Sequence, residues 1–260
     1  MVELISKISK GSKMDQVYIP KNRVDLAIGS YVIIRPLETT LKEEIKPFFY
    51  NIKYIEPIKL VMIKEIFNII EEIVKSDNII ITGSFLEKGF KFNDIDIIIV
   101  SEKKSNAKYI EDILENKIGA KSHIISIDNK TMIKGLSTDP LYRVMLSKCI
   151  SKKRMIYNIK PEINYKLLDL HLLKSKILID NFDMLDGDEK YYFIRNMIAI
   201  FLFLKLKKID KEKIDKEIKK IFKLKDVDEI KRNVLNRREF LKKYRQIYNK
   251  TFNLLMSNIK

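Results

Sequence analysis

The chain has 260 residues, of which 46% are hydrophobic, and a formal net charge of +16. This length allows about two domains, and the apolar content excludes general disorder. The basic balance favours nucleic acid, nucleotides or another anionic partner, with a lysine-rich surface that only aids solubility as the alternative. The single cysteine, Cys149, excludes an internal disulfide and a multi-cysteine zinc site. No signal peptide or membrane-length apolar run is evident, so we expect a cytoplasmic protein.

Residues 1–37 are expected to form a small β-rich unit. Strand patterns at 4–9 and 16–19 flank a polar turn, a short helical or turn segment is expected from residue 19 to residue 24, and another strand is expected at 31–36. A unit of this size cannot bury enough apolar surface alone, so we expect it to dimerise or to dock elsewhere on the chain. Residues 38–56 are expected to form a connector.

The series QVYIPK at 16–21 and GSYVII at 29–34 resembles the swapped-hairpin, AbrB-like DNA-binding domains. The family often has an aspartate where Ser30 stands and a glycine near Asp15. The resemblance implies an intertwined homodimer that presents four basic side chains to DNA phosphates, namely Lys7, Lys10, Lys13 and Arg23. The alternative is a small β-extension that contacts the rest of the chain.

The central part alternates helix and strand patterns. Pro57 is typical of a first helical turn, and an apolar stripe continues that helix to about residue 75. Residues 79–82 predict a buried strand that enters a tight turn at Gly83-Ser84, with a short helix from Ser84 that buries Phe85, Leu86 and Phe90. Further along, the patterns predict a strand, a helix, a strand, a helix and a last short strand, at 94–100, about 109–114, 122–127, 139–150 and 154–157.

Two carboxylates mark the second of these strands. Because side chains alternate along a strand, Asp94 and Asp96 are expected on one face, roughly 6–7 Å apart. Oxygen ligands suit Mg²⁺, which typically uses one or two carboxylates together with substrate phosphates. The N–H groups at Gly83-Ser84 are well placed for a phosphate. The alternative is a buried strand whose aspartates only cap or pair.

Gly83-Ser84, a nine-residue gap and then Asp94-Ile95-Asp96 is similar to the motif of the polymerase-β-like nucleotidyltransferase superfamily. The helix at Asp139-Pro140, followed by a short strand, resembles the small antitoxin-type and antibiotic-type members. The resemblance implies an α/β (α+β) domain with a mixed sheet over 57–160. It also implies a nucleoside triphosphate at Gly83 and Ser84, and Mg²⁺ or Mn²⁺ at Asp94 and Asp96. An acceptor hydroxyl would attack the α-phosphorus, with AMP from ATP as the expected transferred group.

Members of that family normally have a third carboxylate on a following strand, often as the general base. The strand at 122–127 offers His123 near its start and Asp128 just past its end, and residue parity does not decide between them. Each also has a plain structural interpretation. His123 would be a partly buried histidine with its polar atoms satisfied, and Asp128 would be a turn residue.

Residues 161–260 predict an all-α bundle of four helices, separated by polar breaks. In several nucleotidyltransferases such a bundle shapes the acceptor site. Two hypotheses follow from the whole sequence. The first is a nucleotidyltransferase that modifies a hydroxyl on a protein, an RNA or a small molecule. The second is a DNA-binding, antitoxin-like regulator whose transferase domain binds nucleotide with little turnover.

Overall fold

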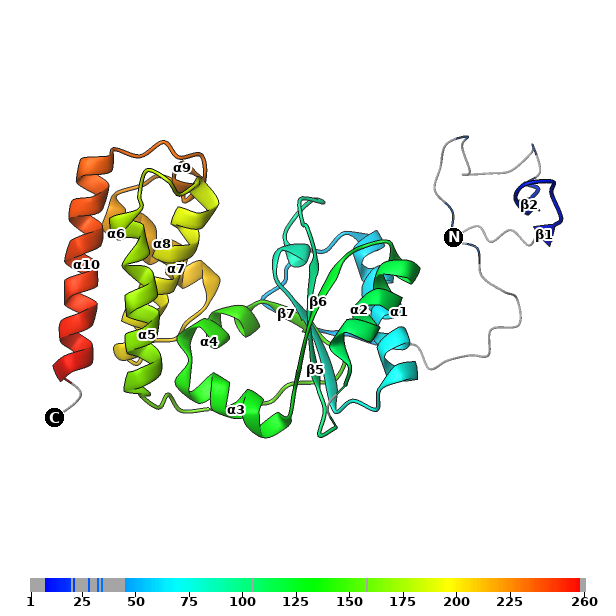
Figure 1. The fold of residues 1–260 in the computed structure, drawn as a ribbon, viewed down its shortest axis with the longest axis horizontal. Coiled ribbons are helices and arrows are strands. Elements are labelled where there is room, and N and C mark those ends of the chain that lie inside the picture. Colours follow the sequence, from blue (N-terminus) through cyan, green and yellow to red (C-terminus); the bar gives the residue numbers. More distant parts are fainter. Residues whose placement is uncertain are drawn as a thin grey trace. The chain divides into compact units, whose positions relative to one another are not determined.

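The computed structural model describes residues 8–19, 21, 28, 32, 34, 45–103, 105–157 and 159–257 (Figure 1). The chain divides into two compact units, Met1–Glu44 and Ile45–Lys260. In the first unit, β1 (Ile8–Ser9) and β2 (Gln16–Val17) form an antiparallel hairpin. The short helical or turn segment expected at 19–24 and the strand expected at 31–36 lie largely outside the described residues, and Lys7 and Arg23 lie outside them as well.

The second unit is built on a five-stranded mixed sheet in the order β3-β7-β4-β5-β6. β4 runs antiparallel to β5 and β7, and β5 runs parallel to β6. A parallel pair requires a crossover connection, which α2 (Ala107–Ile118) supplies between β5 and β6. The mixed sheet confirms the α/β expectation. The strands are β3 (Phe48–Tyr50), β4 (Asn78–Thr82), β5 (Ile95–Val100), β6 (Ser122–Ile127) and β7 (Cys149–Ser151).

Isoleucine in β4 and β5 is buried on both faces of the sheet, which explains why these strands lack a polar side. Ile79 and Ile97 pack on one face together with α1 (Pro57–Ile73) and α2. Ile80 and Ile98 pack on the other face with side chains of α3 (Asn129–Thr138) and α4 (Pro140–Ser147). Figure 1 shows the sheet between these two helical layers. Asp96 has the parity of Ile98 and therefore belongs to the α3/α4 face.

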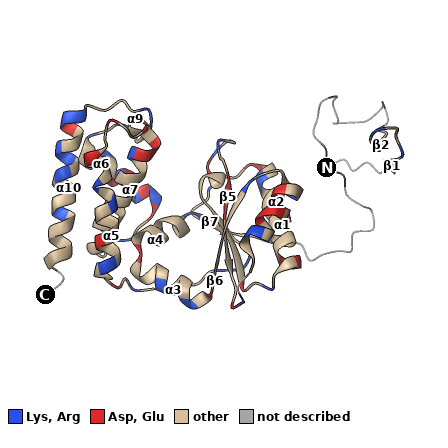
Figure 2. Cartoon of the chain, in the orientation of Figure 1, with Lys and Arg blue, Asp and Glu red and all other residues tan. Residues whose placement is uncertain are grey.

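The bundle, α5 to α10, is organised around α7 (Gly187–Leu204), which is buried on all sides from Asn196 to Leu204. α7 contacts α4 as well as α5, α8, α9 and α10, so it joins the bundle to the sheet layer. Among the described helices, none has the length and apolar character that a bilayer crossing needs. The other bundle helices are α5 (Tyr165–Ser175), α6 (Ile177–Asp180), α8 (Lys211–Phe222), α9 (Asp228–Lys231) and α10 (Arg237–Ser257). Basic residues recur along α10 (Figure 2).

The structure corrects several sequence-based boundaries. The helix expected to reach residue 150 ends at Ser147, and the following strand is β7 rather than residues 154–157. α3 occupies the segment after β6, where only a turn was expected. The connector at 38–56 contributes β3 to the sheet. Phe90 is 60% exposed, whereas Phe85 and Leu86 are buried as expected.

Candidate functional site

β4 ends in a turn that requires glycine. Gly83 has φ 82° and ψ −161°, a backbone region that is essentially restricted to glycine. A Cβ at this position would also overlap Oδ2 of Asp96. Ser84 follows as an exposed residue and opens the 3-10 turn η1 (Ser84–Leu86). The turn therefore places bare backbone against Asp96 and leaves Ser84 accessible to a ligand.

Three polar side chains lie side by side on neighbouring strands. Thr82 is opposite Asp96 in the β4–β5 pair, and His123 is opposite Asp96 in the β5–β6 pair. Nδ1 of His123 is 3.5 Å from Oδ1 of Asp96. The His123 side chain is 60% exposed and that of Asp96 is 38% exposed. Asp96 and His123 are thus open to solvent, whereas Thr82 beside them is buried.

Asp94 immediately precedes β5 and acts electrostatically on Asp96. Burial raises the pKa of Asp96 and the charge of Asp94 raises it further, while His123 opposes both effects. A divalent cation would relieve this repulsion between carboxylates, so the donor set fits a hard metal ion. Within the described residues, no three or more Asp, Glu, His or Cys side chains form a metal-holding group. A cation here would take its remaining ligands from water or from substrate phosphates.

Asp128 does not belong to this site. It follows the last residue of β6, five positions after His123, which corresponds to roughly 16 Å along a strand. Its carboxylate accepts a 2.6 Å hydrogen bond from the N–H of Thr131 and caps α3. That hydrogen bond lowers the pKa of Asp128. Of the two residues predicted for the third polar position, only His123 contacts Asp96.

Lys59, which is fully buried, holds the segment that follows Gly83-Ser84. Its Nζ donates a 2.6 Å hydrogen bond to the carbonyl oxygen of Glu87 and lies 3.3 Å from Oε2 of Glu56. The carboxylate of Glu56 in turn accepts a 2.6 Å hydrogen bond from the N–H of Gly89. Three rings surround Nζ with centroids 5.4 to 5.6 Å away, those of Phe85, Phe90 and Phe92.

Two lysines from distant parts of the chain meet at Glu87. Nζ of Lys148 lies 3.0 Å from Oε2 of Glu87, and Nζ of Lys211 lies 2.6 Å from Oε1. The N–H of Glu87 donates to the carbonyl oxygen of Ser84 at 3.0 Å. The hydroxyl of Thr82 lies 2.7 Å from the carbonyl oxygen of Met145 and 3.1 Å from that of Lys148, and it donates its proton to this end of α4. Both lysines therefore lie next to the Gly83-Ser84 turn. Sequence reasoning missed them because nothing distinguishes two lysines among 51 basic residues.

A second polar contact joins the start of α4 to the bundle. The side chain of Asp139 accepts a 2.8 Å hydrogen bond from the N–H of Leu141 and caps α4. Nε2 of His171, on α5, lies 3.3 Å from the same Oδ1. Burial raises the pKa of Asp139, but His171 and the N–H groups of Leu141 and Tyr142 outweigh it and lower the pKa overall.

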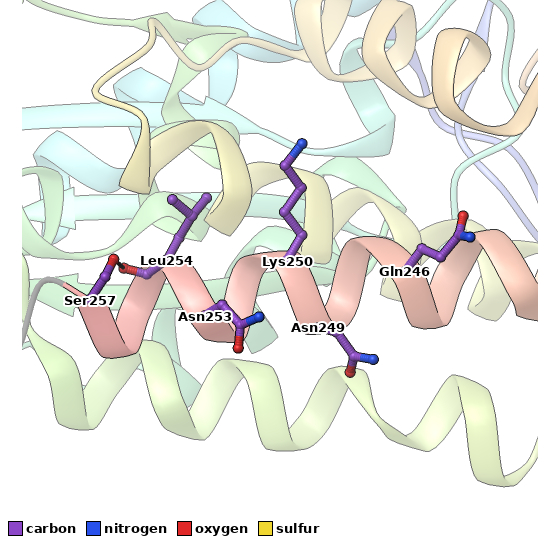
Figure 3. Close-up of a pocket in the computed structure, with 6 residues that line it drawn as sticks. All are labelled: Gln246, Asn249, Lys250, Asn253, Leu254 and Ser257. Carbon is purple, nitrogen blue, oxygen red and sulfur yellow. Dashed lines mark hydrogen bonds between the residues drawn. The ribbon is translucent and has the colours of Figure 1, made fainter.

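The remaining predicted residues lie elsewhere. Lys10 and Lys13 are exposed in the hairpin of the first unit, and Lys7 and Arg23 are outside the described residues. A groove along α10 (Figure 3) contains none of the predicted site residues. Its lining residues are Gln246, Asn249, Lys250, Asn253, Leu254 and Ser257.

Comparisons with known proteins found no match for this chain among protein-family models, curated proteins or solved structures.

Proposed function

We propose that the chain is a nucleotidyltransferase that depends on Mg²⁺ or Mn²⁺ and transfers a nucleoside monophosphate to a hydroxyl acceptor. AMP from ATP is the expected donor group. The observation that carries this proposal is the contact of Asp96 with both the Gly83 turn and His123. A divalent cation at Asp94 and Asp96 would supply charge neutralisation for the triphosphate and orient it for in-line displacement.

The chain's own groups have separate roles in this proposal. Backbone N–H groups at Gly83 and Ser84, with the exposed Ser84 hydroxyl, bind triphosphate oxygens. Asp94 and Asp96 hold the cation. In the transfer, the acceptor oxygen forms a bond to the α-phosphorus, the bond from that phosphorus to the bridging oxygen breaks, and pyrophosphate leaves with the bonding electrons.

In this proposal His123 removes the acceptor's proton. Its Nδ1 faces the Asp96 carboxylate at 3.5 Å, which favours the tautomer with the proton on Nδ1. That tautomer leaves Nε2 unprotonated and able to accept a proton from a hydroxyl. The exposure of His123 allows an acceptor to approach it from solvent.

The test is release of pyrophosphate from labelled ATP in the presence of Mg²⁺ or Mn²⁺ and candidate acceptors. Replacing Asp94 or Asp96 by asparagine should reduce release about a thousandfold, which corresponds to about 4 kcal/mol of transition-state stabilisation. Asp112→Asn is the matched control, because that carboxylate is exposed on α2 and pairs with Lys108, which is exposed as well. Equal release by wild type and both site variants would refute the proposal.

A second candidate function is a DNA-binding regulator whose transferase domain binds nucleotide with little turnover. It is favoured by the β1–β2 hairpin, which exposes Lys10 and Lys13, and by the net charge of +16. Binding to duplex DNA should weaken steeply with salt because counterions are released from the phosphates. Lys10→Glu and Lys13→Glu should weaken binding further. Binding that is absent, or insensitive to salt, would contradict this candidate.

A further inference from the structure

Glu87 binds two ammonium groups, one at each carboxylate oxygen, beside the Gly83-Ser84 turn. The three side chains are half-buried, with exposed fractions of 42% for Glu87, 25% for Lys148 and 37% for Lys211. Burial raises the pKa of Glu87, but Lys211 and Lys148 outweigh it and lower the pKa overall. The carboxylate is therefore ionised at neutral pH and bridges α8 of the bundle to the segment that follows α4.

The two ammonium groups resemble a binding site for an anion, in which the carboxylate of Glu87 takes the place of the anion. A phosphate group also presents neighbouring anionic oxygens, and lysine binds phosphate as a point charge. Two ammonium groups and one carboxylate leave an excess positive charge among these three side chains, although the nearby carboxylate of Asp215 also acts on Lys211. A polyphosphate with several negative charges would attract the lysines more strongly than the single charge of Glu87 does. The backbone of Glu87 is held by Lys59, and only its side chain needs to move aside.

We propose that Lys148 and Lys211 bind the polyphosphate of the nucleotide, and that Glu87 is its internal competitor in the nucleotide-free protein. This inference rests on the proposed function, because it places the polyphosphate at the Gly83-Ser84 turn. The inference also gives the bundle a role. Because Lys211 is the first residue of α8, a bound nucleotide would contact the bundle as well as the sheet layer.

The test is isothermal titration calorimetry of the full-length protein with ATP and, in a separate titration, with inorganic tripolyphosphate. Lys148→Gln and Lys211→Gln should each weaken binding of both probes about tenfold, the loss expected for one charge-assisted contact. Glu87→Gln should tighten binding of both probes by about threefold or more, since the competitor is then uncharged.

Lys53→Gln is the matched control, because Lys53 pairs with Glu212, also on α8, and both side chains are exposed. It should bind as wild type does. Thermal unfolding of each variant checks that it is folded, and Lys211→Arg should keep most of the affinity.

The outcomes separate this inference from the proposed function. If ATP binding depends on Asp96 but not on Lys148 or Lys211, the lysine site is refuted and the transferase proposal stands. If tripolyphosphate binding depends on both lysines while no pyrophosphate is released, the lysine site is supported and the transferase proposal fails. A wild-type protein that binds neither probe, or a Glu87→Gln variant that binds both more weakly, overturns the inference.

Discussion

Asp96 lies against Gly83 so closely that its carboxylate occupies the space where a side chain at position 83 would be. The backbone of Gly83 also has a conformation that other residues avoid. The glycine is therefore needed twice, once for the direction of the chain after β4 and once to leave room for the carboxylate. The Asp96 carboxylate can therefore take its observed position only if residue 83 is glycine.

Replacing Gly83 by alanine should abolish nucleotide binding and lower the free energy of unfolding by about 1–3 kcal/mol from backbone strain alone. The Cβ would in addition displace Asp96. Gly89→Ala is the matched control, because Gly89 has a similar φ of 84° but no atom within 4 Å of an added Cβ. Urea unfolding and ATP titration measure the two effects. Equal loss of ATP binding in both variants would show that strain, not the contact with Asp96, decides.

His123→Ala should reduce pyrophosphate release by at least about a hundredfold, the usual contribution of a positioned general base. Asp128→Asn should leave release unchanged, because Asp128 caps α3 and asparagine caps a helix about as well. Initial rates at saturating ATP make the comparison. If Asp128→Asn lost activity and His123→Ala kept it, the assignment of the third polar position would be reversed.

Lys59→Met should destabilise the protein on the order of 2 kcal/mol, because it leaves the Glu87 carbonyl oxygen and the Glu56 carboxylate without their buried partner. Lys108→Met removes a lysine whose pair with Asp112 is exposed on α2, and it should have no measurable effect. Urea unfolding reports both changes. A Lys59→Met protein as stable as wild type would mean that the three phenylalanine rings, not the ammonium group, hold this segment.

The pH dependence of stability should distinguish Asp139 from Asp215. The pKa of Asp139 is lowered in the folded protein, so its charge stabilises the fold above its ordinary value of 3.8 and this gain is lost as the pH falls through the folded pKa. The stability gap between wild type and Asp139→Asn should therefore shrink in acid. Asp215 lies on α8, where its Oδ1 accepts a 2.7 Å hydrogen bond from the hydroxyl of Tyr191. Its pKa is raised, mainly by burial, against the opposing effect of this hydrogen bond. Its contribution is present below 3.8 and is lost as the pH rises through the folded pKa, so Asp215→Asn should gain on wild type with rising pH. Urea unfolding between pH 3 and 7 measures both slopes, and parallel slopes would contradict the assignment.

The strands that form the site could be predicted because short runs rich in β-branched isoleucine, bounded by turn residues, favour buried strands. The Gly83-Ser84 turn was also predictable, since the sequence breaks the apolar run abruptly there. β7 was misplaced because Cys149-Ile150-Ser151 continues the apolar pattern of the preceding helix. α3 was missed because Gly135 and several polar residues weaken its helical pattern.

The composition of the site was less predictable than its strands. The role of His123 depends on the register between β5 and β6, and a shift of one residue would have turned it to the other face. Lys211 meets Glu87 across 124 residues of sequence. Contacts of this kind follow from how α8 packs beside the turn, which no local pattern encodes.

β6 is the last strand of the sheet, and no described strand pairs with its outer edge. His123 stands at the start of this edge strand and not in the middle of the sheet. The His123 side chain is also 60% exposed, so in the proposed transfer an incoming hydroxyl would not have to enter an enclosed chamber to reach the imidazole. For the proposed transferase, the size of the acceptor molecule would then not be limited by an enclosing cavity, and a hydroxyl on a folded protein or at the end of an RNA strand would be as admissible as one on a small metabolite.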